Sequence, residues 1–276
     1  MSAEELELLD EFISNHFGMS FPTHRKEVLE SRLLPRLRET NSKTFLDYYY
    51  ALQFSENGNG KTEIQALARA ITNNETYFLR ETHQFEALTS EVAAWRKAAG
   101  DNAGPFRLLS AGCSSGEEPM SIGIHLKENQ GRYWGQEFGF DAFDVDPDRI
   151  ATARAGEYGL TSLRALTLEQ RERYLQSSGP ELWKVRPSWK PDVRFQVGNL
   201  LDPASYGPSG RYDAIFCRNV LIYFSEESLI RTVRNFHRAL RPGGLLFLGH
   251  SESIIGLIPQ LEAVRIANCI VYRRIA

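Results

Sequence analysis

The sequence predicts an α/β protein in which a doubly wound, mostly parallel sheet follows a small all-α domain. Three observations lead to this fold class. Apolar residues recur at three- and four-residue steps up to about residue 70, whereas short apolar runs alternate with helical stretches from Phe106 onward. The final run, "NCIVYRRI", follows "GLLFLGHS" too closely for another crossover helix. We therefore expect the last strand to be antiparallel.

Residues 1–70 form the predicted all-α domain, and residues 71–276 form the predicted α/β domain. The first helical pattern places apolar residues at Leu6, Leu9, Phe12, Ile13 and Phe17. A second pattern repeats this spacing at Val28, Leu29, Leu33 and Leu37. Pro35 is expected to kink or end the second helix. The stretch "SENGNGK" (55–61) has the composition of a loop.

Five apolar runs are predicted to be parallel strands, namely "FRLLSAG", "EFGFDAFDVD", "VRFQVGNL", "YDAIFCRN" and "GLLFLGHS". Helices are expected between several of them, in "EEPMSIGIHLKENQ", "DPDRIATARAGEY" and "SEESLIRTVRNFHRAL". The alternation breaks between Tyr158 and Asp192, where a long connection is rich in Trp, Pro and Arg. Long insertions in compact folds are more often functional than idle, so we expect this one to have a role.

Composition and charge exclude several classes of protein. With 276 residues, 42% of them hydrophobic, the chain has room for one large domain and a small one. The net charge of −3 gives no global attraction to nucleic acid, and no apolar run suits insertion into a membrane. The acidic N-terminus is unlike a signal peptide. The three cysteines have no disulfide or metal-site spacing, so we expect a cytoplasmic protein without a bound metal.

The stretch "LLSAGCSSGEEPMSIGIHL" (108–126) places small residues where a strand passes into a helix. Ligands of doubly wound sheets bind beyond the carboxyl ends of the strands, and Gly112 and Gly116 would let a ligand approach the backbone. Glu117 and Glu118 in the first helical turn would repel a phosphate and favour a cationic ligand. The alternative is the ordinary preference of helix N-termini for acidic residues.

S-adenosylmethionine (SAM) fits such an acidic pocket because it carries a sulfonium and an ammonium group. Asp144, at the end of "FDAFD", lies where these sheets place a carboxylate for ribose hydroxyls, with Asp146 as the competing candidate. The fourth strand end, "FCRNVLIYF", lacks the Asn/Asp-Pro-Pro-aromatic tetrad of methyltransferases that act on amino groups. Cys217 is interpreted as a small buried residue. Tyr223 either belongs to the core or presents its hydroxyl to the transfer site.

The second helical stretch, "HRKEVLESRLLPRLRET", concentrates positive charge on a slightly acidic chain. Its basic residues are Arg25, Lys26, Arg32, Arg36 and Arg38. Such a stretch is either a solvated helix face or a docking surface for an acidic partner, and the sequence leaves both interpretations open.

Five motifs, "ITNNETYFLRE", "SAGCSSGEEPMS", "FDVD", "FCRNVLIYF" and "LRPGGLLFLGHSES", occur in this order. Together they resemble the bacterial chemotaxis receptor glutamate methyltransferases, the CheR family, from the basic N-terminal helices to the C-terminal strand. The resemblance implies a class I, Rossmann-like, SAM-dependent methyltransferase domain with an inserted β-subdomain at about residues 159–193. It also implies the conversion of receptor glutamates to γ-methyl esters, with S-adenosylhomocysteine as the other product.

The resemblance also assigns residues to the site. Those that match the family's cofactor contacts are Asn74, Thr76, Arg80, Glu117, Asp144, Asn199, Leu200, Cys217 and Arg218. Gly112 joins them because it lies in the small-residue loop. Arg80 and Tyr223 match the pair nearest the transferred methyl group, so they are the candidate catalytic residues.

The implied partners are methyl-accepting chemotaxis receptors, whose methylation regions are helical and acidic. Arg32, Arg36 and Arg38 would hold them, and we expect the enzyme to act as a monomer. The segment "LQSSGPELWK" is shorter and poorer in glycine than in members that bind a receptor pentapeptide, which indicates the pentapeptide-independent branch. Methylation of another protein or of a small carboxylate, and a non-catalytic SAM-binding adaptor, remain alternatives.

Overall fold

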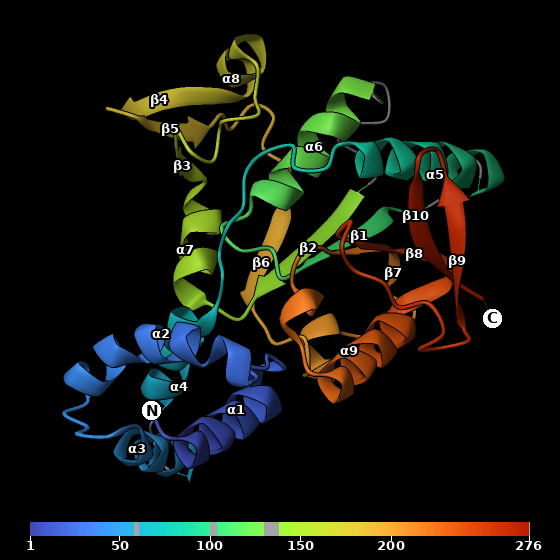
Figure 1. Cartoon of the computed structure of the whole chain (residues 1–276). Helices are drawn as coiled ribbons and strands as arrows, with labels where there is room; N and C mark the ends of the chain where they lie inside the picture. Colours follow the sequence, from blue (N-terminus) through green and yellow to red (C-terminus); the bar gives the residue numbers. More distant parts are fainter. Residues whose placement is uncertain (58–60, 100–103, 130–137, 276) are drawn as a thin grey trace.

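The computed structural model describes residues 1–57, 61–99, 104–129 and 138–275. Figure 1 shows a twisted central sheet with helices on both faces, the N-terminal helices gathered at one end, and a small second sheet beside α7 and α6. The predicted α/β fold class is therefore confirmed, together with the all-α N-terminal region and the inserted β-structure.

The central sheet has the strand order β6-β2-β1-β7-β8-β10-β9. Strands β6, β2, β1, β7 and β8 are parallel to one another, and β10 is antiparallel to both β8 and β9. The predicted antiparallel last strand is thus confirmed, whereas β9 was not expected. The strands are β1 (Phe106–Ala111), β2 (Phe138–Asp144), β6 (Val193–Val197), β7 (Tyr212–Cys217), β8 (Leu240–Leu248), β9 (Leu261–Ile266) and β10 (Cys269–Arg274).

Apolar side chains on the two faces of the sheet pack against different helices. Helices α5 (His83–Ala99) and α6 (Glu117–Asn129) bury residues such as Phe85 and Ile122 against Leu108 and Phe216 of one face. Helix α9 (Glu226–Ala239) covers the other face. Helix α7 (Pro147–Ala155) packs beside β2 and β6. Helix α5 was not predicted from the sequence. Because both faces are covered, the strands read as nearly continuous apolar runs.

The segment "LRPGG" (240–244) has the composition of a tight turn, yet it lies within β8. Its pairing with β7 is irregular, because the register shifts between Tyr212–Leu240 and Ala214–Leu245. Gly243 has a positive φ of 79°, which an L side chain rarely adopts, and this allows the extra residues to bulge out of the ladder.

The N-terminal domain contains α1 (Ala3–Phe17), α2 (Lys26–Glu39), α3 (Phe45–Asn57) and α4 (Lys61–Ile71). The first predicted apolar set is buried in its core, together with Leu29, Leu33 and Leu37. Val28 is instead 41% exposed. Helix α2 also continues through Pro35, because Leu33 and Leu37 anchor both flanks and Arg36 pairs with Glu63 of α4. Residues 55–57 of the predicted loop belong to α3, and residues 58–60 lie outside the described residues.

The insertion forms a separate three-stranded antiparallel sheet of order β3-β5-β4. Helix α8 (Leu168–Tyr174) precedes its hairpin. Trp189 packs on Tyr174 with ring centroids 4.7 Å apart, and its indole N–H donates to the Tyr174 carbonyl. This aromatic pair joins the residue before β4 to the segment after β5. The strands of the small sheet are β3 (Glu157–Gly159), β4 (Leu175–Gly179) and β5 (Leu182–Val185).

The two domains are joined by backbone pairing as well as by the chain. Ser20 N donates to the Tyr223 carbonyl over 2.8 Å, and Ser225 N donates to the Gly18 carbonyl over 3.0 Å. Met19 and Phe224 form an antiparallel bridge between these bonds. We call this contact the domain bridge (Gly18–Ser20 with Tyr223–Ser225). Within the described residues, no helix has the length and apolar character needed to cross a lipid bilayer.

Replacement of Gly18 tests the domain bridge. Gly18 has a φ of +82°, and an added Cβ would lie 2.5 Å from the Phe224 ring. We expect Gly18→Ala to lower the free energy of unfolding by about 1–3 kcal/mol, through backbone strain and the clash. Urea denaturation measures this change. Gly159→Ala is the control, because an added Cβ at Gly159 meets no atom within 4 Å. Equal losses in the two variants would contradict the assignment.

Candidate functional site

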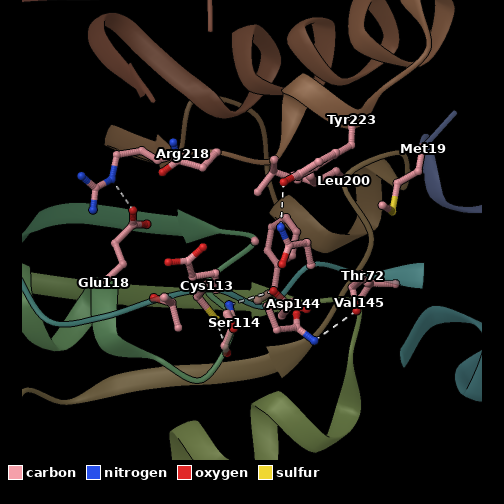
Figure 2. Close-up of a pocket in the computed structure, with 18 of the residues that line it drawn as sticks. Met19, Thr72, Cys113, Ser114, Glu118, Asp144, Val145, Leu200, Arg218 and Tyr223 are labelled. Carbon is pink, nitrogen blue, oxygen red and sulfur yellow. Dashed lines mark hydrogen bonds and ion pairs between the residues drawn. The ribbon is translucent and has the colours of Figure 1, made fainter. Parts of the chain in front are cut away.

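A cavity of about 950 Å³, open to solvent, lies at the carboxyl ends of β1, β2 and β7. Ligands of open α/β sheets bind at this edge. The N-terminal domain and the linker after α4 complete the wall, so both domains contribute to one site. Figure 2 shows Arg218 and Glu118 on one side of the cavity and Met19 and Thr72 on the other. Apolar lining residues include Phe17, Met19, Phe143, Leu200, Val220 and Phe224.

The loop after β1 brings bare backbone to the cavity. Gly112 and Ser114 have φ angles of +79° and +48°, and both residues line the cavity. The amides of Gly112 and Cys113 donate to the Phe143 carbonyl over 2.8 and 3.0 Å, which fixes the loop to the end of β2. An added Cβ at Gly112 would lie 3.0 Å from Val220 Cγ2. Glycine is therefore needed where this loop meets the 219–223 segment.

Asp144 is the acidic group at the end of β2. Only 7% of the residue is exposed, and its carboxylate accepts from Ser114 N at 2.8 Å and Asp146 N at 3.0 Å. Burial raises the pKa of the Asp144 carboxyl above its usual range, and the two backbone donors oppose that rise. The competing candidate, Asp146, is the N-cap of α7 and accepts from Asp148 N. Asp146 also accepts from Asn74 Nδ2 at 3.3 Å, so it supports a lining residue.

Glu117, which the resemblance assigns to the cofactor, does not lie on the cavity wall. Glu117 is 1% exposed, and its carboxylate accepts from the hydroxyls of Ser115 and Ser162 at 2.8 Å. Glu118 lines the cavity in its place. Successive helical residues point about 100° apart, so a one-residue change at the start of α6 exchanges the buried face for the cavity face.

Glu118 forms a buried ion pair with Arg218, which follows β7. Arg218 Nε lies 2.6 Å from Glu118 Oε2, and the two side chains are 3% and 11% exposed. Glu118 Oε1 also accepts from Ser110 Oγ at 2.6 Å, and Arg218 Nη1 donates to the Arg80 carbonyl at 2.7 Å. A charged pair in this position requires such additional hydrogen bonds to offset its desolvation. Arg218 thereby connects the end of β7 to the linker that carries Arg80.

Tyr223 ends the short helix η4 (Leu221–Tyr223) and lines the cavity. Its hydroxyl accepts from Asn73 Nδ2 at 2.9 Å. The Arg25 guanidinium lies 5.3 Å from the centre of its ring, so a cationic side chain from the N-terminal domain borders the same edge. The sequence left open whether Tyr223 was a core residue, and the structure places it on the cavity wall.

Arg80 and Thr76 line the cavity from the linker, as does Tyr77. Arg80 Nη1 donates to the Glu75 carbonyl at 3.0 Å, which leaves other guanidinium N–H groups available to a ligand. Arg164, from the inserted segment, lies 3.8 Å over the Tyr77 ring and pairs with Glu75 at 3.0 Å. The insertion therefore braces this side of the site.

Asn199 and Leu200, after β6, also line the cavity. The Asn199 side chain donates to the His16 carbonyl at 2.6 Å and so ties the end of β6 to α1. Cys217 does not line the cavity: it is fully buried in β7, within the core cluster under α9. Its interpretation as a small core residue fits this position.

The predicted site residues that the structure brings together at the cavity are Asn74, Thr76, Arg80, Gly112, Asp144, Asn199, Leu200, Arg218 and Tyr223. Sequence reasoning missed Asn73, Glu118 as a lining residue, and the contribution of α1 through Phe17 and Met19. Asn73 was adjacent to a predicted contact, which was a usable signal. Phe17 followed the apolar helical pattern and gave no sign that it would face a cavity.

The chain was compared with known proteins. The "CheR methyltransferase, SAM binding domain" family model matches residues 74–268, and the "CheR methyltransferase, all-alpha domain" model matches residues 4–72. Chemotaxis protein methyltransferase 1 of Pseudomonas aeruginosa is 34% identical over 274 residues, covering 98% of this chain and 97% of that protein. Chemotaxis protein methyltransferase Cher2 of Pseudomonas putida is 33% identical, covering 95% and 94%.

The chemotaxis protein methyltransferase of Salmonella typhimurium is 36% identical over 255 residues, covering 91% of this chain and 84% of that protein. The two family models together account for nearly the whole chain, in the order in which its all-α and α/β parts occur. The chain therefore belongs to the CheR methyltransferase family.

Proposed function

We propose that this protein transfers the methyl group of SAM to glutamate side chains of chemoreceptors and forms γ-glutamyl methyl esters in chemotactic adaptation. The observation that carries the proposal is a single cavity that brings together the Asp144 carboxylate, the bare backbone at Gly112 and the Tyr223 hydroxyl. Membership of the CheR methyltransferase family supports the same reaction.

The residues of the cavity fit SAM. Ser114 Oγ is buried and finds no hydrogen-bond partner among the described residues, so a polar group of a ligand would satisfy it. Glu118 is balanced by Arg218, whereas Asp144 accepts from the backbone amides of Ser114 and Asp146. Asp144 therefore supplies negative charge that suits ribose hydroxyls and a cationic ligand. We assign the cofactor contacts to Asn74, Thr76, Arg80, Gly112, Asp144, Asn199, Leu200 and Arg218, and we add Glu118 to them.

Bound SAM supplies an electrophilic methyl group on a positively charged sulfur. A glutamate side chain is already ionised at neutral pH, with a reference pKa of about 4.3, so no general base is needed. The protein must instead align the carboxylate with the methyl group and exclude water, and such orientation can lower a barrier by up to about 7–11 kcal/mol. Apolar lining residues such as Met19, Leu200 and Val220 reduce the access of water.

Tyr223 and Arg80 are the proposed catalytic residues. Because Asn73 donates to the Tyr223 hydroxyl oxygen, the hydroxyl proton remains available to orient a substrate carboxylate. Arg80 positions a carboxylate, either that of the substrate or that of the cofactor. Too tight a grip by Arg80 on the substrate would lower the nucleophilicity of its oxygen, so the orienting role belongs mainly to Tyr223.

Substitution of the two residues tests these roles. We expect Tyr223→Phe to lower kcat about 10- to 100-fold, because one orienting hydrogen bond is lost. Arg80→Ala should also lower turnover at saturating SAM and receptor. The measurement uses labelled SAM and receptor fragments, with base lability of the product as the sign of a methyl ester. Tyr50→Phe is the control, because Tyr50 is 61% exposed on α3. Wild-type turnover by Arg80→Ala would remove Arg80 from the assignment.

The raised pKa of Asp144 predicts a pH dependence of cofactor binding. A carboxyl whose pKa is raised takes up its proton at a higher pH than an ordinary aspartate, and protonation removes the charge. The affinity for S-adenosylhomocysteine should therefore fall as the pH is lowered through that range. Asp144→Asn should bind S-adenosylhomocysteine about 10- to 100-fold more weakly at neutral pH, because a charge-assisted bond is lost. Its affinity should also depend less on pH in the acid range.

Calorimetric titration at several pH values measures this effect. Asp148→Asn is the control, because the Asp148 side chain is 70% exposed and pairs with Arg69 on the surface. If the affinity of Asp144→Asn fell at low pH as steeply as that of the wild type, the titration would belong to another group.

We further propose that the basic surface of α2 holds the acidic receptor helix. The structure changes the choice of residues. Arg36 pairs with Glu63 and Glu39, and Arg32 donates to the Ile71 carbonyl, so both also serve the fold of the N-terminal domain. Arg38 is exposed at the end of α2, and Arg25 lies beside Tyr223. Charge on this surface would steer an acidic helix toward the cavity.

Charge reversal at Arg38 tests this surface. Arg38→Glu should raise the KM for receptor fragments about two- to tenfold at low salt, because an exposed attraction becomes a repulsion, and the effect should shrink as salt screens it. The kcat should be unchanged, since Arg38 does not line the cavity. Arg265→Glu, on the exposed face of β9, is the matched control. A KM equal to that of the control at every salt concentration would leave α2 as a solvated helix face.

A further inference from the structure

We propose that Glu252 is a positioning residue for Tyr223, an inference that rests on the catalytic role proposed for Tyr223. Glu252 follows β8 in the motif "GHSES" and does not line the cavity. Its carboxylate instead accepts backbone N–H bonds from the segment that leads to Tyr223. We call residues 219–223 the tyrosine strap.

The two carboxylate oxygens divide the strap between them. Glu252 Oε1 accepts from the amides of Val220, Leu221 and Ile222 at 2.8, 2.7 and 3.3 Å. Glu252 Oε2 accepts from Asn219 N at 2.9 Å, and also from Gly249 N at 2.6 Å. Four consecutive strap amides thus converge on one side chain. The first amides of a helical turn have no partner within the turn, so this carboxylate supplies the acceptor that they lack.

The strap begins with a sharp change of backbone direction. Asn219 has a φ of +60°, in the left-handed region that asparagine adopts more readily than most residues other than glycine. An added Cβ at Gly249 would lie 2.7 Å from Asn219 Nδ2 and 2.9 Å from Glu252 Oε2, so the end of β8 fits tightly beneath the strap. The strap therefore begins at a point fixed by Glu252 and Gly249.

The far end of the strap is fixed by the N-terminal domain and by the linker after α4. Ser20 N donates to the Tyr223 carbonyl at 2.8 Å, and Asn73 Nδ2 donates to the Tyr223 hydroxyl at 2.9 Å. In the middle of the strap, Val220 packs on Gly112 of the loop after β1. The hydroxyl of Tyr223 thus reaches the cavity from a strap held at both ends, and Glu252 accepts the four backbone N–H bonds of its first half.

We call the hydrogen bonds between Glu252 and the strap amides the clamp. The clamp requires a carboxylate. An ionised carboxylate only accepts, whereas a glutamine would present an N–H₂ group to two or three backbone donors. Glu252→Gln therefore removes acceptors without changing the size of the side chain. The strap should loosen, and the Tyr223 hydroxyl should lose the fixed geometry on which methyl transfer depends.

A double-mutant cycle tests the inference. Glu252→Gln should lower kcat about 10- to 100-fold at saturating SAM and receptor fragment, as Tyr223→Phe does. The double variant should have a kcat within about twofold of that of Tyr223→Phe alone, because residues that act as a unit are not additive. The affinity for S-adenosylhomocysteine, measured by calorimetry, should change less than about threefold, since the loss concerns orientation rather than uniform binding.

Glu262→Gln is the matched control, because it removes an exposed carboxylate on β9 and should keep wild-type kcat. Gly249→Ala is a second variant that keeps the carboxylate but crowds Asn219, and its kcat should likewise fall. Added to Tyr223→Phe, Gly249→Ala should lower kcat no further. This variant decides the question if Glu252→Gln does not fold.

Two results would overturn the inference. One is wild-type kcat in both Glu252→Gln and Gly249→Ala. The other is a loss in the double variants equal to the product of the single losses, which would mean that the clamp acts independently of Tyr223. The proposed function fails in a different way: wild-type protein would give no base-labile methyl ester. Full activity of Tyr223→Phe would overturn the catalytic role of Tyr223 and this inference with it, but not the proposed reaction.

Discussion

The domain bridge is the interaction on which the site depends. It pairs backbone groups of Gly18–Ser20 with those of Tyr223–Ser225, so it fixes the position of Tyr223 and at the same time places Phe17 and Met19 over the cavity. Asn199 adds a second tie through the His16 carbonyl. Because these contacts are mainly backbone hydrogen bonds, they depend on backbone geometry, and at Gly18 that geometry requires a glycine.

The charges of the cavity are arranged so that one acid remains available to a ligand. Glu118 and Arg218 neutralise each other within a network that includes Ser110 and the Arg80 carbonyl. Asp144 is held by the backbone amides of Ser114 and Asp146, and burial makes its charge costly. A cationic ligand with hydroxyl donors would offset that cost, which is why the cavity suits SAM better than a phosphate-bearing nucleotide.

Much of the fold followed from patterns that physical chemistry fixes locally. The apolar runs gave the parallel strands, and small residues after β1 marked the cofactor loop. The errors occurred where tertiary contacts override local rules: α2 passes through Pro35 because both of its flanks are buried, and "LRPGG" becomes a bulge inside β8. The resemblance selected Glu117, whereas Glu118 lines the cavity, because successive helical residues point about 100° apart. The clamp at Glu252 joins residues far apart in the chain, and no local pattern announces it.

The shared wall of the cavity has a thermodynamic consequence. A ligand that touches both domains binds only when they are assembled, so part of its binding free energy becomes cohesion between them. Occupancy by cofactor should then make the all-α and α/β halves melt as one cooperative unit, whereas the empty protein can open along that seam. A substrate that binds at the same wall would then meet two domains whose relative position the cofactor has already fixed.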